Sequence, residues 1–304
     1  SAASDVYKRQ LLVKQTLTDA DGDSVTSSGL DIGTGNFLKV EDDGPKAATP
    51  DAALLGTVNA AVLDESAKPE AGDGVYTATV DVSAAFGSTA AGSYGTDGAG
   101  STAYTVSLNN GTSVGSGLYL LDPTDIDPAG GLGKGAEILL VDNGDGTVKG
   151  VDPNNTSNTI FTISVNGDGV VKFEYSNTTD PANIWHGSNP SGDDASLLQT
   201  SVSGALLVKQ TLTDADGDKA TSAGLDIGTG SFLKVEDDGP KAATPNAALL
   251  GTVNAAVLDE SAKPTAGDGV YTATVDVSAA FGSTAAGSYG TDGAGSTAYT
   301  VSLN

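Results

Sequence analysis

The chain has 304 residues and a formal net charge of −25, with 41 glycines, 5% aromatic residues and no cysteine. A chain this negative repels nucleic acid and anionic membrane surfaces. No apolar run reaches the length of a membrane span. Neither nucleic acid nor a membrane is therefore expected as a partner. Without cysteine, disulfides and cysteine-based zinc sites are excluded.

The first ten residues, SAASDVYKRQ, differ in composition from everything that follows. They bear no likeness to the equivalent stretch at 196–205, and they hold Arg9, the only arginine. Because they resemble a translated sequencing adaptor, we interpret 1–10 as a non-native or linker peptide and leave it out of the fold prediction.

A near-exact repeat dominates the rest of the chain. Residues 11–109 recur as 206–304, an offset of 206 − 11 = 195 residues. A unit of this length can bury its own core, so the sequence predicts whole domains in tandem, and the chain is expected to be a fragment of that array. The aligned pairs that differ are Ser24/Lys219, Val25/Ala220, Ser28/Ala223, Asn36/Ser231, Asp51/Asn246 and Glu70/Thr265.

The motif VEDDGP marks each boundary between repeats, at 40–45 and 235–240. Proline has no backbone donor and favours an extended preceding residue, so a strand ladder is expected to end there. On this basis 11–44 is predicted to be the C-terminal end of a preceding module. Residues 45–239 form one complete module, and 240–304 form the N-terminal third of the next.

Within the complete module, apolar residues alternate with polar ones in short runs, which is typical of half-buried strands. Acidity with few aromatics is also typical of disorder, but this regular alternation favours folded β-structure whose carboxylates are neutralised by cations. Asn-Gly-Asp-Gly at 143–146 and at 166–169 predicts hairpin turns. The predicted strands are 75–82, 102–108, 118–121, 137–141, 159–165, 170–175, 206–213 and 232–236.

These elements predict an all-β fold made of tandem antiparallel β-sandwich modules, similar in general form to immunoglobulin or cadherin domains.

The loop DADGD carries three carboxylates at alternate positions beside a glycine. Converging carboxylate oxygens suit Ca²⁺, which binds six to eight oxygen ligands. The pattern is not an EF-hand, because Ser24 and Leu30 stand where that loop needs Gly and Glu. A solvated acidic turn is the alternative. The candidate ligands are Asp19, Asp21 and Asp23, with their repeats Asp214, Asp216 and Asp218.

Further acidic clusters flank the module boundary. If the DADGD loop lies at the same end of its module, these clusters would meet at one interface between modules and share Ca²⁺. The sequence is equally compatible with separate surface carboxylates that bind no metal. A fourth cluster, Asp122, Asp125 and Asp127, is also explained by proline-flanked turns. The boundary candidates are Glu41, Asp42, Asp43, Asp64 and Glu65, with their repeats Glu236, Asp237, Asp238, Asp259 and Glu260.

The order of motifs resembles a known family. LDES at 63–66, Trp185-His186 before an acidic loop at 193–194, LTDADGD and VEDDGP are together similar to the repeat domain of large type I-secreted RTX-type adhesins of Gram-negative bacteria. The resemblance implies a calcium-binding β-sandwich, secreted and exposed at the cell surface, that serves adhesion or biofilm formation. The glycine-rich stretch at 130–135 lacks the aspartate of the RTX nonapeptide, so no β-roll is expected here.

Enzyme motifs are weak. GTSVG at 111–115 matches a nucleophile elbow, but no helical pattern follows it, and Gly133-Lys134 lacks the other residues of a phosphate loop. His186 is the only histidine, so we interpret it as structural and Trp185 as a core or edge anchor. The sequence therefore predicts no enzyme.

The leading hypothesis is a calcium-stiffened extender of a secreted adhesin, whose partners are neighbouring repeats of the same chain. Surface glycans or abiotic surfaces would be bound through other parts of the full protein. Alternatively, each module binds a glycan or surface itself and gains avidity from repetition. A glycosidase is a remote third hypothesis, because paired carboxylates are plentiful but aromatics are few. Candidates for a glycan surface are Tyr94, Tyr104, Tyr119 and Trp185.

Overall fold

The computed structural model describes residues 10–55, 58–65, 76–87, 92–109, 111, 113–127, 131–176, 184–187, 195–237, 239–251, 253–258, 272–282, 287, 289 and 296–303. The chain divides into two compact units, 1–44 and 45–304. Almost all regular structure is β, and the only helices among the described residues are single 3-10 turns. None of these turns is long or apolar enough to cross a lipid bilayer.

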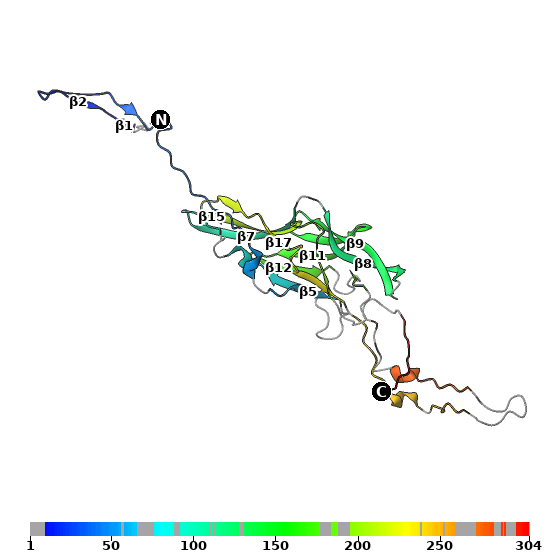
Figure 1. Ribbon diagram of the computed structural model, residues 1–304. Coiled ribbons are helices and arrows are strands. Elements are labelled where there is room, and N and C mark those ends of the chain that lie inside the picture. Colours follow the sequence, from blue (N-terminus) through cyan, green and yellow to red (C-terminus); the bar gives the residue numbers. More distant parts are fainter. Residues whose placement is uncertain are drawn as a thin grey trace, which may run out of the picture. The chain divides into compact units, whose positions relative to one another are not determined.

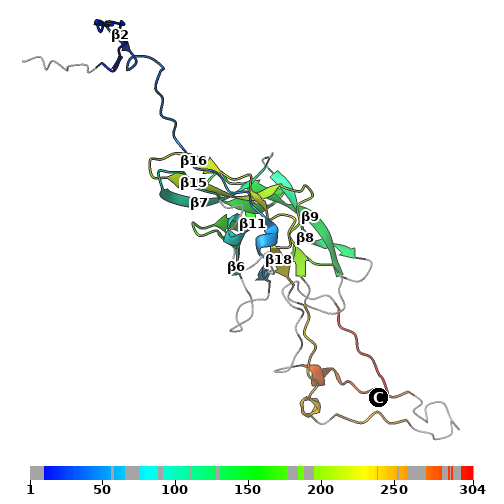
Figure 2. The same cartoon turned by 60° about the vertical axis from the view of Figure 1, so that its left-hand side comes forward.

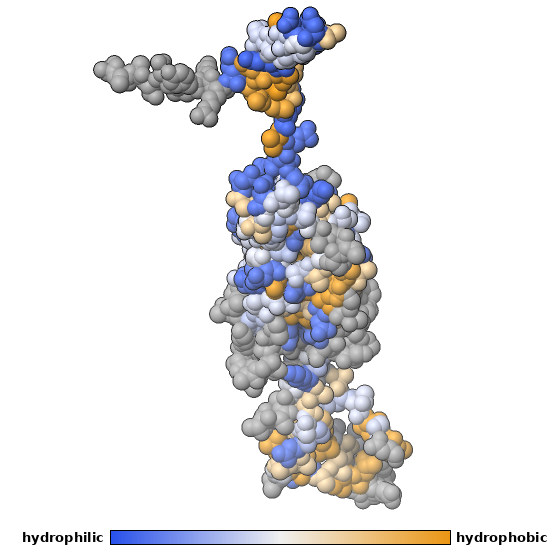
Figure 3. Space-filling model, turned by 90° about the vertical axis from the view of Figure 1, so that its left-hand side faces the viewer, coloured by the Kyte–Doolittle hydropathy of each residue, from blue (hydrophilic) through white to orange (hydrophobic). Residues whose placement is uncertain are grey.

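The first unit contains two small antiparallel ladders. Strand β1 (Leu12–Val13) pairs with β4 (Leu30–Asp31), and β2 (Thr16–Thr18) pairs with β3 (Ser24–Thr26). Each of these strands has one partner only, so apolar side chains of this unit remain on the surface (Figure 3).

A seven-stranded antiparallel sheet forms one layer of the second unit, in the order β13-β8-β9-β10-β11-β12-β6 (Figure 1). Its central strands are joined by short turns, so neighbours in sequence are neighbours in the sheet. The strands are β6 (Thr77–Asp81), β8 (Ser113–Asp127), β9 (Gly131–Asp142), β10 (Val148–Asp152), β11 (Asn155–Val165), β12 (Val170–Tyr175) and β13 (Ile184–Trp185).

Two smaller sheets complete the unit. One has the order β14-β18-β5; in the other, β15 pairs with β7, β16 and β17. Their strands come from the two ends of the 195-residue repeat, so folding the unit brings its beginning and its end together. The strands are β5 (Ala61–Asp64), β7 (Ala99–Leu108), β14 (Ala195–Leu197), β15 (Leu206–Asp214), β16 (Lys219–Thr221), β17 (Leu225–Asp226) and β18 (Leu233–Glu236).

One pairing differs from the predicted antiparallel pattern. Strand β18 pairs with β5 in parallel, with Leu233 opposite Ala61 and Glu236 opposite Asp64. Parallel neighbours need a long crossover connection, and here most of the module separates the two strands in sequence.

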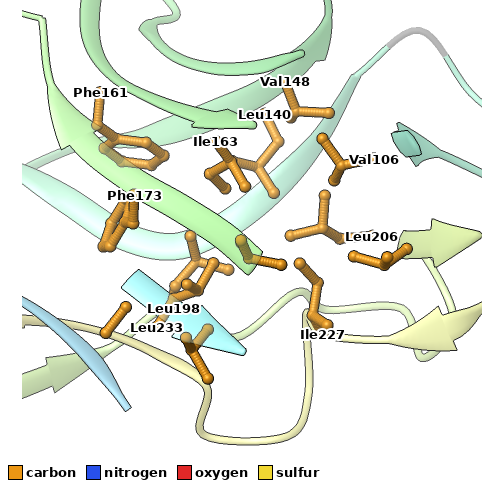
Figure 4. Close-up of a cluster of buried hydrophobic side chains, with 14 of the residues drawn as sticks. Val106, Leu140, Val148, Phe161, Ile163, Phe173, Leu198, Leu206, Ile227 and Leu233 are labelled. Carbon is orange, nitrogen blue, oxygen red and sulfur yellow. The ribbon is translucent and has the colours of Figure 1, made fainter. Parts of the chain in front are cut away.

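The core lies between the layers, where side chains of the large sheet meet those of the smaller sheets (Figure 4). Phe161 and Phe173 are fully buried and pack edge to face, with ring centroids 5.0 Å apart. On β12 the alternate residues Lys172 and Glu174 point the other way and form an ion pair of 2.8 Å. The predicted all-β sandwich is therefore confirmed.

Both predicted hairpin turns are confirmed. Asn143 N–H donates to the Thr147 carbonyl at 3.0 Å between β9 and β10, and Asn166 N–H donates to Val170 O at 3.1 Å between β11 and β12. The Asn166 side chain also accepts from the Val170 N–H at 2.9 Å, which fixes the second turn.

Residues 240–304 fold differently from their copies in the repeat. Their described part contains the 3-10 turns η4 (Ala247–Leu250) and η5 (Ser278–Phe281) and no strand, whereas 45–109 contains similar turns, η1 (Ala52–Leu55) and η2 (Ser83–Phe86), together with β5, β6 and β7. Leu258 is 64% exposed, whereas Leu63, its copy in β5, is fully buried. These strands therefore form only where their sheet partners are present.

Candidate cation-binding sites

The Asp214–Asp218 loop connects β15 to β16. Asp214 N–H donates to the Asp218 carbonyl at 3.1 Å, and Asp214 Oδ1 accepts from the backbone N–H groups of Gly217 at 3.0 Å and Asp218 at 2.8 Å. Gly217 has φ +110°, a conformation that side-chain-bearing residues rarely adopt. The turn therefore needs both the aspartate and the glycine of the motif.

The copy at 19–23 has the same geometry. Asp19 N–H donates to Asp23 O at 2.9 Å, Asp19 Oδ1 accepts from Gly22 N–H at 3.1 Å and Asp23 N–H at 2.8 Å, and Gly22 has φ +104°. The two loops lie in different units and in different surroundings. The local sequence alone therefore determines this loop.

In each loop the three carboxylates converge. One oxygen of each of Asp214, Asp216 and Asp218 lies within 4.8 Å of the others, and Asp19, Asp21 and Asp23 are arranged in the same way. Asp214 is only 2% exposed, and both backbone N–H groups that it accepts bond to its Oδ1 and not to its Oδ2. A buried carboxylate beside two others is a candidate ligand for a cation.

The carboxylates at Asp214 and Asp216 are electrostatically linked. A hydrogen bond to Asp214 raises the pKa of Asp216 to about 6, with further contributions from burial and from the charges of Asp214 and Asp97. Burial acts to raise the pKa of Asp214, but hydrogen bonds from Asp216 and from the loop backbone lower it overall. Asp216 is therefore protonated up to a higher pH than an ordinary aspartate, and a cation would displace that proton.

A second cluster combines Glu65, His186 and Asp237. These residues directly follow β5, β13 and β18, and one ligand atom of each lies within 4.8 Å of the others. His186 Nε2 is 3.4 Å from Glu65 Oε2, and both side chains are 1% exposed. The sequence suggested Glu65 and Asp237 as ligands but not His186, because a position after a two-residue strand carries no local signal.

Backbone and side-chain hydrogen bonds hold Glu65 in place. Glu65 Oε1 accepts from the Tyr175 hydroxyl at 3.2 Å and from Ile184 N–H at 3.0 Å, and Glu65 N–H donates to Glu236 O at 3.1 Å. Burial, followed by the nearby charge of Glu65 and its hydrogen bond, strongly raises the pKa of Tyr175. Tyr175 therefore remains a hydroxyl donor.

The remaining predicted ligands are placed as follows. Asp64 lies opposite Glu236 in the parallel ladder, so these two boundary clusters meet within one module. The Asp214 loop and the ends of β5 and β18 lie toward opposite ends of the sandwich (Figures 1 and 2). Glu41, Asp42 and Asp43 are exposed in the first unit. Asp238, Asp259 and Glu260, and the loop at 193–194, lie outside the described residues.

In the fourth acidic cluster, Asp122 is held by its own turn. Asp122 Oδ1 accepts from the backbone N–H and the hydroxyl of Thr124 at 2.8 and 2.7 Å, and these bonds lower the pKa of Asp122. Asp122 and Asp127 face Gly133 and Gly131 along the β8–β9 pairing. Turn hydrogen bonding accounts for the position of Asp122 without a cation.

Two of the four candidate aromatics are engaged internally. The Tyr94 hydroxyl bonds to Thr102 Oγ1 at 2.6 Å, and the Tyr104 hydroxyl accepts from the Gln210 side-chain amide at 2.9 Å. Trp185 lies opposite Tyr119 at the edge of the large sheet, as predicted for an edge anchor.

The fold and these clusters define an all-β sandwich module with candidate cation sites. Residues 60–228 match the family model described as a domain of unknown function (DUF5801), so the chain belongs to this family. The match begins just before β5 and ends after β17, within the predicted complete module. No curated protein and no solved structure matches the chain.

Proposed function

We propose that this chain is a calcium-stiffened extender from a large secreted cell-surface adhesin, and that it acts in adhesion or biofilm formation. The observation that carries the proposal is the Asp214 loop, where a buried carboxylate faces two others across a glycine turn. Its recurrence at 19–23, the net charge of −25 and the resemblance to RTX-type adhesin repeats support the same function. The protein is not proposed to be an enzyme.

The mechanism is linkage between calcium binding and folding. Ca²⁺ that binds only the folded state stabilises it by RT ln(1 + [L]/Kd), which is about 2.7 kcal/mol for each site at a hundredfold excess over Kd. Low calcium inside the cell would leave the chain pliable for type I export, and calcium outside would rigidify it. Serial modules would then carry a distal adhesive tip away from the cell.

The test replaces Asp214, Asp216 and Asp218 with Asn in the full chain. Asn retains the Oδ1 acceptor that closes the turn but removes the charges, so we expect weaker calcium binding by calorimetry. The melting temperature in saturating Ca²⁺ should fall, while stability in chelator should not fall.

A matched control replaces Asp145, Asp152 and Asp168 with Asn. It removes the same number of charges from three separate turns. We expect this control to bind and melt like the parent. If the loop variant also melts like the parent in saturating Ca²⁺, the loop is an ordinary acidic turn.

A second candidate function is binding of a glycan by each module. It is favoured by the cross-strand pair of Tyr119 and Trp185 at the sheet edge, because adjacent aromatic rings suit sugar faces. However, Lys134 Nζ lies 3.3 Å from the Tyr119 ring centroid and 5.1 Å from that of Trp185, so the cation already occupies this surface. A glycan array with the parent and Trp185→Ala would decide: binding lost in the variant supports this function.

A further inference from the structure

We propose that Glu65, His186 and Asp237 form a binding site for a single Zn²⁺ or a similar first-row divalent metal, distinct from the calcium loops. The inference does not depend on the proposed function. It starts from the mixed donor set: one imidazole and two carboxylates converge within 4.8 Å.

The backbone positions the three donors together. Parallel pairing sets Asp64 opposite Glu236, so the next residues, Glu65 and Asp237, leave neighbouring strands side by side. His186 follows β13, whose Ile184 N–H donates to Glu65 Oε1 at 3.0 Å. The site therefore joins three segments that lie far apart in the sequence.

The charges of the cluster suit a divalent cation. Glu65 and His186 have side chains that are 1% exposed, and burial of charged groups costs several kcal/mol for each ion. Counted over these three side chains alone, a protonated imidazole offsets one of the two negative charges. A divalent cation bound by a neutral imidazole balances both, which gives the cluster zero net charge.

The separation of the donors also suits a metal. Two ligands at 2.0 to 2.2 Å from one tetrahedral Zn²⁺ are about 3.3 Å apart. His186 Nε2 and Glu65 Oε2 are 3.4 Å apart, which is longer than a charge-assisted hydrogen bond of about 2.7–2.9 Å. Glu65 is held by bonds to its other oxygen, Oε1, so Oε2 is directed at the histidine.

The imidazole selects the class of metal. Ca²⁺ and Mg²⁺ take oxygen ligands, whereas imidazole suits zinc and its neighbours in the first transition row. Three protein ligands leave one tetrahedral position for water. Because His186 is the only histidine, the chain is expected to hold one such metal, although it has two DADGD loops.

The experiment is a titration of chelator-stripped full chain with Zn²⁺ alone. Trp185, the only tryptophan, directly precedes His186 and serves as a fluorescence reporter. We expect one Zn²⁺ per chain by calorimetry, a matching fluorescence change and no displacement by excess Ca²⁺. Co²⁺ in the parent should give visible absorption bands typical of tetrahedral coordination.

Two variants remove ligands while keeping side-chain size. His186→Gln and Glu65→Gln should each weaken Zn²⁺ binding by more than about 100-fold, whereas Tyr175→Phe, which removes a hydrogen bond to a ligand, should weaken it by about 10- to 100-fold. The matched control is the triple Asn variant at 214, 216 and 218, which should bind Zn²⁺ like the parent.

The outcomes separate the two proposals. Weaker calcium binding in the loop variant alone, with weaker zinc binding in His186→Gln and Glu65→Gln but not in the loop variant, supports both sites. If the parent shows no saturable Zn²⁺ binding and no cobalt bands, the cluster is a metal-free buried ion pair and the inference is wrong. Equal zinc affinity in parent and His186→Gln would overturn it as well, even if the calcium result holds.

Discussion

At the scale of single residues, the raised pKa of Asp216 beside Asp214 has the clearest consequence for stability in solution. Asp216 has a pKa of about 6, above its ordinary value of 3.8, because it donates a hydrogen bond to its neighbour while it is protonated. In the unfolded chain this interaction is absent. The folded state therefore binds more protons than the unfolded state between these two values.

The sign of the pH dependence follows from this difference. Without metal, the contribution of Asp216 to stability falls as pH rises from about 4 to about 6. We expect Asp216→Asn in chelator to gain stability relative to the parent across this range, because Asn has no charge to develop. Thermal melts of both proteins at several pH values would measure the difference.

Asp145→Asn is the control for that series. Hydrogen bonds, above all from the Thr147 hydroxyl, lower the pKa of Asp145, so this carboxylate stays ionised throughout the range. Its stability difference from the parent should be flat from about pH 5 to about 6, where that of Asp216→Asn still changes. A flat difference for Asp216→Asn as well would contradict the shared proton.

At the scale of elements, the pairing of β10 with β11 depends on a missing side chain. Gly150 lies directly opposite Phe161, and a Cβ on Gly150 would overlap the phenyl ring. Phe161 is fully buried in the core, so its ring has little freedom to move away. A glycine in mid-strand usually weakens a sheet, but here it allows the aromatic ring to cover the backbone.

Replacing Gly150 with Ala tests this packing. We expect overpacking to destabilise the protein by about 1–3 kcal/mol in urea unfolding. Gly167→Ala, in the turn between β11 and β12, is the control, since a Cβ there meets nothing within 4 Å. It should change stability by less than about 0.5 kcal/mol. Equal effects of the two changes would show that Phe161 accommodates the methyl group.

The elements that the sequence predicted are those with local signals. Alternation identified β12 and β15, and the asparagine-glycine turns identified two hairpins. The DADGD loop was also predictable, because it closes on its own backbone. Strand β10 and the partnership of β5 with β18 were missed, because a short strand between turns has little periodicity and a pairing across the whole module has no local trace.

The same limit applies to the candidate sites. Asp214, Asp216 and Asp218 are close in sequence, so spacing alone brought them together. His186 was interpreted as structural because it is the only histidine, and its two acidic neighbours come from segments far away in the sequence. Only the parallel register of β5 and β18 places Glu65 and Asp237 beside it.

At the scale of the whole molecule, one sequence occurs in two settings. Val208 and Val235 are fully buried, whereas their copies Val13 and Val40 are 54% and 100% exposed. In 45–239 these strands have the partners β7 and β5, which the first unit does not supply from its own residues. The repeat therefore folds as a closed unit whose first and last segments need each other.

This closure predicts how truncated chains behave. We expect residues 45–239 alone to unfold in one cooperative thermal transition, and 240–304 alone to show none, because the latter segment lacks the partners of its strands. Circular dichroism and calorimetry would measure both. The matched comparison is 45–304, which should melt at the temperature of 45–239. A cooperative transition from the isolated 65-residue tail would contradict the boundary at 239/240.

The parallel ladder of β5 and β18 also bears on how a module responds to tension. The chain enters β5 at Ala61 and leaves β18 at Glu236, and the two strands point the same way in register. A pull on the two ends of the module would slide these strands past each other along their length. The hydrogen bonds between them would then be loaded in shear, so that they resist the force together. They would not break one after another. If the chain acts as the proposed extender, loading these strands in shear would give each module mechanical strength.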